Sequence, residues 1–209
     1  MGGVVDTMQT RTEKGGTNSD GSVGTGLVIE RRFTTVGEDP FDQFEWIEMD
    51  VEIRNADGSL AHRIDDVRLP SGYSGVPGKV LAQKYLRKAG VPAILRKVAE
   101  DGVPEWLQRS EPDHEKLQTL EPDQRYIGES HGRELFRRLA GTWTYWGWKH
   151  GYFEAEADAR AYFDEMCFLI ASQRSAPNSP QWFNTGLHWA YGIEGPAQGH
   201  RYIDPDTGE

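Results

Sequence analysis

The chain has 209 residues, enough for one domain of ordinary size with a substantial buried core. It carries 23 basic and 33 acidic side chains, a formal net charge of −10, and this acidity argues against non-specific binding to nucleic acid, which needs a surplus of lysine and arginine. The sequence has no apolar run long enough to cross a membrane and no signal-peptide pattern, so we expect a cytoplasmic protein without a membrane partner.

The N-terminal part of the chain predicts a tail followed by β-structure. Residues 1–26 are rich in Gly, Thr and Ser and have almost no hydrophobic periodicity, which predicts a flexible tail. A short apolar and basic run predicts a strand over residues 27–35. From residue 47 to residue 54, apolar and charged side chains alternate, and the turn residues 55–58 predict a hairpin with a return strand over residues 60–69.

The middle of the chain predicts two short helices and an irregular stretch. The first helix is expected over residues 79–89, closed by Gly90, and the second over residues 92–100, with a proline in its first position. The charged, proline-punctuated segment 101–129 is typical of a surface insertion, and we assign it no role.

Two longer helices are predicted next. The first covers residues 131–150, with Ser130 as its N-cap, and the second covers residues 155–174. Their apolar stripes consist of Leu135, Leu139, Trp143, Trp146 and His150 in the first helix, and of Ala159, Tyr162, Phe163, Met166 and Ile170 in the second. The two stripes predict an αα-hairpin around a shared aromatic core.

Residues 175–186 follow this hairpin and carry the most unusual local chemistry in the chain. Their two prolines argue against a regular helix or a central strand and predict a shaped loop. Ser179, between Asn178 and Pro180, offers a hydroxyl and neighbouring N–H groups to an anionic ligand. On local chemistry alone, a polar turn with satisfied hydrogen bonds is the favoured alternative. The chain after residue 186 predicts a turn-rich tail without a closing helix or strand.

The remaining reactive side chains do not predict a catalytic centre. No two of the six histidines show a metal-ligand spacing, so no metal site is expected. Cys167, the single cysteine, excludes an internal disulfide and dithiol chemistry by this chain alone. Its position beside Met166 and Phe168 favours a small buried hydrophobe over a reactive thiol.

Residues 176–186 resemble the N-S-P-x-x-F-N-x-G motif near the N-terminus of the adenosylcobalamin-dependent (class II) ribonucleotide reductase catalytic chain. The resemblance runs from residue 27 to the end. Further runs that resemble the longer bacterial members, in the same order, are residues 31–34, 55–59, 80–92, 145–148, 151–153 and 186–192.

The resemblance implies an enzyme that uses a cobalamin-derived radical, a thiyl radical on a barrel cysteine and a reducing cysteine pair to make deoxyribonucleotides. In that family the serine of the motif contacts the substrate at its phosphate or ribose, which implies a substrate-binding role for Ser179, with Asn178 as a weaker neighbour. The family's cysteines and its ten-stranded α/β barrel follow this turn, and Cys167 precedes it, so no catalytic residue is implied in this chain.

We therefore expect residues 27–209 to form an α+β N-terminal domain, mainly helical with a β-hairpin and an αα-hairpin, leading into a barrel that this chain lacks. The expected partners are a ribonucleotide and the remainder of the catalytic chain, and that remainder is expected to make most of the contacts to adenosylcobalamin. A second copy of the chain is a further candidate partner. No nucleic acid is expected as a partner. By itself the chain is expected to be inactive. The alternative is a non-catalytic interaction or regulatory module derived from the same domain.

Overall fold

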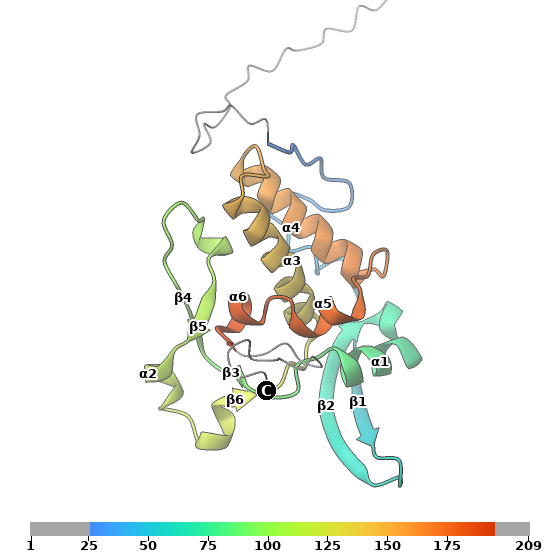
Figure 1. Cartoon of the computed structure of the whole chain (residues 1–209). Helices are drawn as coiled ribbons and strands as arrows, with labels where there is room; N and C mark the ends of the chain where they lie inside the picture. The colour runs from blue at the N-terminus through green and yellow to red at the C-terminus, as the bar shows by residue number, and fades with distance from the viewer. Residues whose placement is uncertain (1–25, 195–209) are drawn as a thin grey trace, which may run out of the picture.

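The computed structural model of the chain describes residues 26–194 (Figure 1). The predicted tail, except Gly26, and the chain from residue 195 lie outside the described residues. The strands are β1 (Trp46–Arg54), β2 (Leu60–Pro70), β3 (Val91–Pro92), β4 (Leu95–Lys97), β5 (Ser110–Pro112) and β6 (Tyr126–Ile127). The α-helices are α1 (Val76–Lys84), α2 (His114–Leu117), α3 (Gly132–Lys149), α4 (Glu156–Ala171), α5 (Ser179–Asn184) and α6 (Leu187–Tyr191), with 3₁₀ turns at Ser71–Tyr73, Glu105–Leu107 and Pro122–Gln124.

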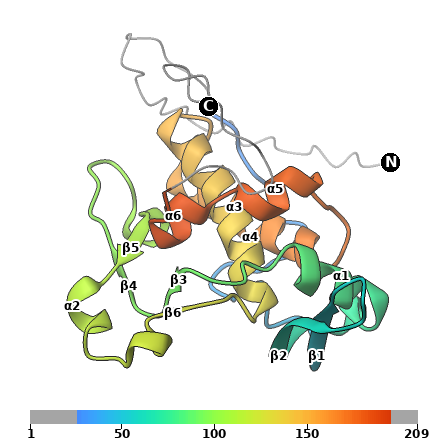
Figure 2. The same ribbon diagram turned by 60° about the horizontal axis from the view of Figure 1, so that its bottom comes forward.

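The architecture is mixed α+β, as expected. The α3–α4 hairpin occupies the centre, with the β1–β2 hairpin and α1 on one side and the smaller β-pairs on the other (Figure 2). Within residues 26–194 the strands form three separate two-stranded antiparallel sheets and no barrel. None of the helices in this part of the chain is long and apolar enough to cross a membrane.

The predicted β-hairpin is confirmed. β1 pairs antiparallel with β2, and Gly58 in the connecting turn has a φ of +85°, a conformation that glycine adopts without steric cost. Val51, Val67 and Leu69 point from the hairpin into the core and are buried. The hairpin therefore packs against α1 and α3. This packing supplies the stability that two strands alone would lack.

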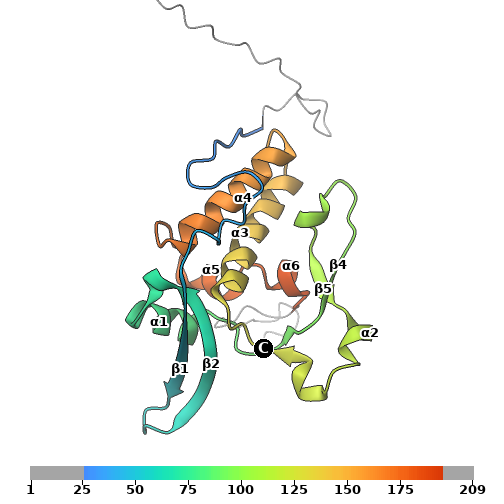
Figure 3. The same ribbon diagram turned by 180° about the vertical axis from the view of Figure 1, so that it is seen from behind.

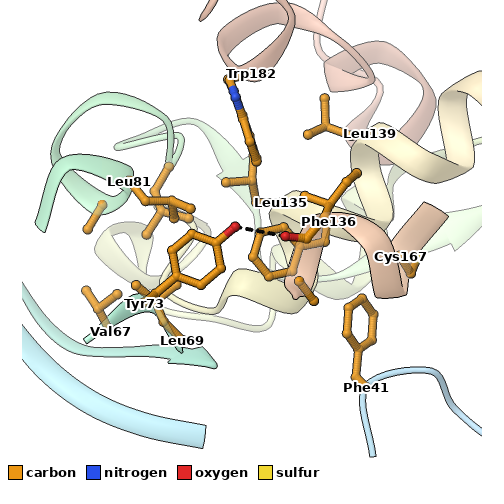
Figure 4. Close-up of a cluster of buried hydrophobic side chains, with 14 of the residues drawn as sticks. Phe41, Val67, Leu69, Tyr73, Leu81, Leu135, Phe136, Leu139, Cys167 and Trp182 are labelled. Atoms are coloured by element: carbon orange, nitrogen blue, oxygen red, sulfur yellow. Dashed lines mark hydrogen bonds between the residues drawn. The ribbon is translucent and has the colours of Figure 1, made fainter. Parts of the chain in front are cut away.

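The predicted αα-hairpin is also confirmed, as α3 and α4. Leu135, Phe136 and Leu139 of α3 are fully buried in the core that Figure 4 shows, together with Ile170 of α4. The hydroxyl of Tyr73 donates to the carbonyl oxygen of Ile170 at 2.8 Å and ties the end of β2 to α4. This cluster joins the sheet side and the helical side into one core.

Cys167 has the buried, apolar role that the sequence predicts. Its side chain is fully buried in the core cluster, and burial raises the pKa of its thiol well above the ordinary value. A thiol with a raised pKa is a poor nucleophile because the thiolate is the reactive form.

The apolar stripe predicted along α3 is buried only in its first half. Leu135 and Leu139 are fully buried, whereas Trp146 is 51% exposed and His150 is exposed. Helical spacing identified one face of the helix, but the core covers only the N-terminal part of that face. The second half of the stripe lies at the surface.

His131, not the predicted Ser130, is the N-cap of α3. Its Nδ1 accepts a hydrogen bond from the N–H of Arg133 at 3.1 Å, and the carboxylate of Glu134 accepts from the N–H groups of Ser130 and His131 at 3.0 and 3.1 Å. Serine is a preferred N-cap residue and histidine is not, so residue type alone predicted Ser130 as the cap.

The strand predicted at residues 27–35 is wrong. Only Leu27 makes a β-bridge, and the segment runs as an irregular, curved chain beside α4 (Figure 3). The N–H groups of residues 32–34 donate to one carboxylate oxygen of Glu165 at 2.9 to 3.2 Å. Burial alone would raise the pKa of the Glu165 carboxyl. The hydrogen bonds from these N–H groups and from the Thr34 hydroxyl outweigh burial, and the pKa lies below its ordinary value. A side chain of α4 thus takes the place of a partner strand.

The helix predicted at residues 79–89 begins and ends earlier than expected, as α1. It accommodates Pro77 because the first turn of a helix has N–H groups without intrahelical acceptors. The helix ends at Lys84, so Gly90, which has a φ of +81°, belongs to the following turn and does not close it.

The helix predicted over residues 92–100 is wrong, because this stretch contains the end of β3 and all of β4. β3 pairs with β6, and β4 pairs with β5. Both partners come from residues 101–129, in which Leu107 and Leu117 are buried. The status of residues 101–129 as an insertion relative to other proteins stays a prediction.

The cap of α3 predicts a pH-dependent stability. Burial, reinforced by the positive charges of Arg133, Arg68 and Arg137, lowers the pKa of His131 from 6.5 to about 4. The unfolded chain then binds the proton more readily than the folded chain, so this contribution to stability is complete above pH 6.5 and is lost as the pH falls toward about 4.

His131→Asn should flatten that decline, because asparagine caps helices without titrating. Urea unfolding at several pH values between about 7 and 4 measures the slope of the unfolding free energy. His150→Asn, at the exposed C-terminal end of the same helix, is the matched control and should keep the decline. A His131→Asn variant with the same slope as the parent would contradict this assignment.

Candidate functional site

The predicted candidate residues, Asn178 and Ser179, lie at the start of α5. Asn178 is the N-cap, its side chain makes no capping hydrogen bond, and Ser179 is the first helical residue; both are exposed. The prediction of a loop throughout residues 175–186 is therefore wrong, because Pro180 sits in the first turn of a helix, where a missing N–H costs nothing. The turn-rich tail predicted beyond residue 186 instead begins with α6.

The Ser179 hydroxyl is oriented by an aromatic side chain from another element. Its Oγ lies 3.1 Å from the hydroxyl of Tyr85, which follows α1. The Tyr85 ring stacks on Trp182 at 5.4 Å between ring centroids, with an interplanar angle of 17°, and its centroid is 5.4 Å from that of Phe183. A hydroxyl has one donor and two acceptor positions, so one contact to Tyr85 leaves Ser179 able to bind a further polar group.

Trp182 anchors the short helix in the core. The indole is 5% exposed, lies in the buried cluster of Figure 4, and meets Phe136 of α3 edge to face, with ring centroids 6.4 Å apart. The buried ring therefore fixes α5 while Ser179, three positions earlier, stays at the surface.

A buried ion pair holds the other end of α5. Arg138 of α3 and Glu129 have side chains that are 1% and 0% exposed, with Nε to Oε1 at 2.8 Å and Nη2 to Oε2 at 3.1 Å. Nη1 of Arg138 donates to the carbonyl oxygen of Thr185 at 2.6 Å, and its Nη2 donates to that of Trp182 at 3.3 Å. The guanidinium thus satisfies carbonyl groups at the C-terminal end of α5, which a six-residue helix cannot satisfy internally.

The carboxylate of Glu129 connects this pair to two further segments. Its Oε1 accepts from the hydroxyl of Tyr191 in α6 at 2.7 Å, and its Oε2 accepts from the N–H of Arg87 at 2.7 Å. Burial alone would lower the pKa of Arg138, but Glu129 outweighs burial and raises it. Burial and the neighbouring Glu129 raise the pKa of the Tyr191 hydroxyl. Arg138 therefore stays charged and Tyr191 stays neutral.

The sequence alone did not predict this network. Glu129 fell in the segment without an assigned role, and Tyr191 fell in the predicted tail. Arg138 carried a usable signal, because it stands three residues after Leu135 and next to Leu139, on the apolar stripe of an amphipathic helix. A charge inside such a stripe indicates a buried partner.

A cavity of about 470 Å³ lies beyond the C-terminal end of α5. Its lining includes Asn184 and Thr185 from the end of α5 and Tyr145 and Trp146 from α3. Gly186 is required here, because it has a φ of +85° and an added Cβ would lie 2.5 Å from the carbonyl oxygen of Arg138 and from the hydroxyl of Thr142. We call this space the α5–α6 cavity. Within residues 26–194 no group of three or more His, Cys, Asp or Glu side chains is placed to hold a metal ion.

Breaking the buried ion pair should be costly. Arg138→Met leaves the Glu129 carboxylate buried without its cation, so we expect a loss of about 3–5 kcal/mol in the free energy of unfolding, measured by urea denaturation. Arg137→Met, one residue earlier, removes an exposed guanidinium paired with Asp39 and should cost about 1 kcal/mol or less. Equal losses in the two variants would rule out a special contribution from the buried pair.

Comparison with known proteins places this architecture in a family. Residues 48–173 match the N-terminal family model described as class II vitamin B12-dependent ribonucleotide reductase. The chain is 55% identical over 183 residues to the vitamin B12-dependent ribonucleotide reductase of Bradyrhizobium diazoefficiens and 54% identical over 183 residues to that of Agrobacterium fabrum. A relative of the same name from Streptomyces avermitilis is 29% identical over 173 residues.

These matches cover most of this chain and a small part of each relative. They span 88%, 88% and 82% of this chain but 15%, 14% and 14% of the Bradyrhizobium, Agrobacterium and Streptomyces proteins. The family model ends at residue 173, before Asn178, so the match to the model does not include the motif turn. The chain belongs to the class II vitamin B12-dependent ribonucleotide reductases and corresponds to their N-terminal region.

Proposed function

We propose that this chain is the N-terminal part of an enzyme that converts ribonucleotides to deoxyribonucleotides, the precursors of DNA, and that it supplies one wall of the substrate site. The observation that carries the proposal is its membership of the reductase family. The remaining part of the enzyme supplies the catalytic cysteines and the barrel, because the single cysteine of this chain is buried in the core.

Ser179 is the residue that we assign to the substrate. The assignment depends on the motif resemblance, and the geometry supports it, because the hydroxyl is exposed and is oriented by Tyr85. Trp182 on one side and Arg138 on the other fix the short helix that carries it. Asn178, exposed and without a capping hydrogen bond, is the neighbouring side chain free to turn toward the same ligand.

Adenosylcobalamin does not fit the aromatic groove beside α3, if the side chains that line this groove are its only partners. The corrin ring carries polar amide side chains, which need hydrogen-bonding partners wherever they are buried. The groove of about 780 Å³ beside α3 is lined mainly by apolar and aromatic side chains and by no Asp, Glu, Asn, Gln, Lys or Arg. We therefore assign the cofactor mainly to the remainder of the enzyme, where it supplies the radical that starts the reaction.

The isolated chain should show no reductase activity with adenosylcobalamin and a dithiol, because the chemistry needs three thiols and one is present. Adding the remainder of the enzyme should restore deoxyribonucleotide formation, measured by chromatography of the products. Robust turnover by the isolated chain would reject the proposal, and full activity of the remainder without this chain would favour the non-catalytic module.

Ser179→Ala in the complete enzyme should lower kcat/KM for the ribonucleotide, mainly through KM, while leaving the affinity for adenosylcobalamin unchanged. Losing one hydrogen bond to a charged group corresponds to about 1.5–3 kcal/mol, or about 10- to 150-fold. Ser175→Ala, in the loop before the helix, is the matched control. Parent-like kinetics for Ser179→Ala would leave the turn with a structural role only.

A further inference from the structure

An aromatic groove lies at the surface beside the second half of α3. Its volume is about 780 Å³, and its lining includes Leu27, Ile29, Trp146, Tyr152, Phe153 and Tyr162, which we call the Trp146 face. Trp146 is 51% exposed, and Leu27 and Tyr152 are each 59% exposed. Large apolar side chains gathered at such exposure on one surface mark an interaction site more often than a solvated one.

The charge distribution on the Trp146 face is that of an interface core. The chain as a whole is 27% charged, yet no Lys, Arg, Asp or Glu lines this groove, and apart from its tyrosines His150 is its one titratable side chain. Depletion of charge together with enrichment of aromatic residues distinguishes the buried centre of protein interfaces from ordinary surface. The composition therefore favours an apolar polypeptide segment as the occupant over a charged nucleotide or a nucleic acid.

The groove is built by defined contacts. An added Cβ on Gly147 would lie 2.7 Å from the ring of Phe153, so this glycine lets the ring pack directly on α3. The backbone of Leu27 donates to the carbonyl oxygen of Tyr152 at 2.7 Å and accepts from the N–H of Glu154 at 3.1 Å.

We call residues 27–35, which lead into the fold, the entry segment. A carboxylate of α4 holds this segment a little beyond Leu27. Asp158 accepts from the N–H of Ile29 at 2.9 Å. The wall contributed by the entry segment is therefore anchored to the helical hairpin at both of the residues that line the groove.

The Trp146 face is continuous with the motif region. Trp146 also lines the α5–α6 cavity, whose lining includes Asn184 and Thr185 of the motif segment. A polypeptide that covers the C-terminal end of the motif segment therefore lies beside the ring of Trp146. The chain spans 15% of the Bradyrhizobium relative, so the polypeptide that remains to be accommodated is several times larger than the chain itself.

We propose that the Trp146 face is the docking surface for the remainder of the reductase polypeptide, which places an apolar segment in the groove. This inference rests on the proposed function, since it names the partner that completes the same site. Trp146 is its central contact because a large, half-exposed indole between two cavities has the properties of an interface hot spot.

Hydroxyl-radical footprinting of the full-length reductase that carries this segment, compared with the 209-residue chain alone, tests the proposal. Oxidation of Trp146 and Tyr152 should fall several-fold in the full-length protein, because docking removes both rings from water. In the full-length protein, Trp146→Gln should restore the oxidation of Tyr152, whereas Trp146→Phe, which keeps an apolar ring, should preserve its protection.

Three results would overturn the proposal. The first is equal oxidation of both rings in the full-length protein and the isolated chain. The second is protection in the isolated chain that grows with protein concentration as a dimer forms, which identifies a second copy as the occupant. The third is protection in the isolated chain that disappears when residues 1–25 are deleted. Footprinting needs no turnover, so protected rings with a silent Ser179→Ala variant would reject the substrate role and keep the docking surface.

Discussion

Arg138 and Glu129 form the buried ion pair on which the arrangement around the motif depends. The guanidinium holds the carbonyl groups at the end of α5, and the carboxylate holds the Tyr191 hydroxyl of α6 and the backbone at Arg87. Two charges with almost no exposure are costly to desolvate, so they persist only because nearly every donor and acceptor around them is used. One interaction thereby joins α3, the end of α5, α6 and the backbone at Arg87.

The placement of Ser179 follows from this constraint. Trp182 buries one face of α5 against the core, while Arg138 closes its C-terminal end, so a helix of six residues keeps a defined position that it would not keep alone. The first turn of the helix is left at the surface beside Tyr85. A rigidly held helix with an exposed hydroxyl at its start is suited to serve as one wall of a site whose other walls come from elsewhere.

Carboxylates have a second structural use along α4. Glu165 and Asp158 of α4 accept the backbone N–H groups of the entry segment, which therefore needs no partner strand. Half of the apolar stripe of α3 remains uncovered beside that segment, and this uncovered half contains Trp146. The core of this chain is complete around Phe136 and Leu139, whereas the surface at the far end of α3 is aromatic and carries no charged side chain in its groove.

The sequence by itself determined the elements whose signals are local. The two-residue alternation from Ile47 to Arg54 and the turn glycine Gly58 specified the hairpin, the helical stripes specified α3 and α4, and the motif around Ser179 identified the family. Only the tertiary structure decided which charges are buried, which apolar residues remain exposed, and which strands find partners. Glu129 meets Tyr191 and Tyr85 meets Ser179 across 62 and 94 residues, and no short-range periodicity records contacts of that separation.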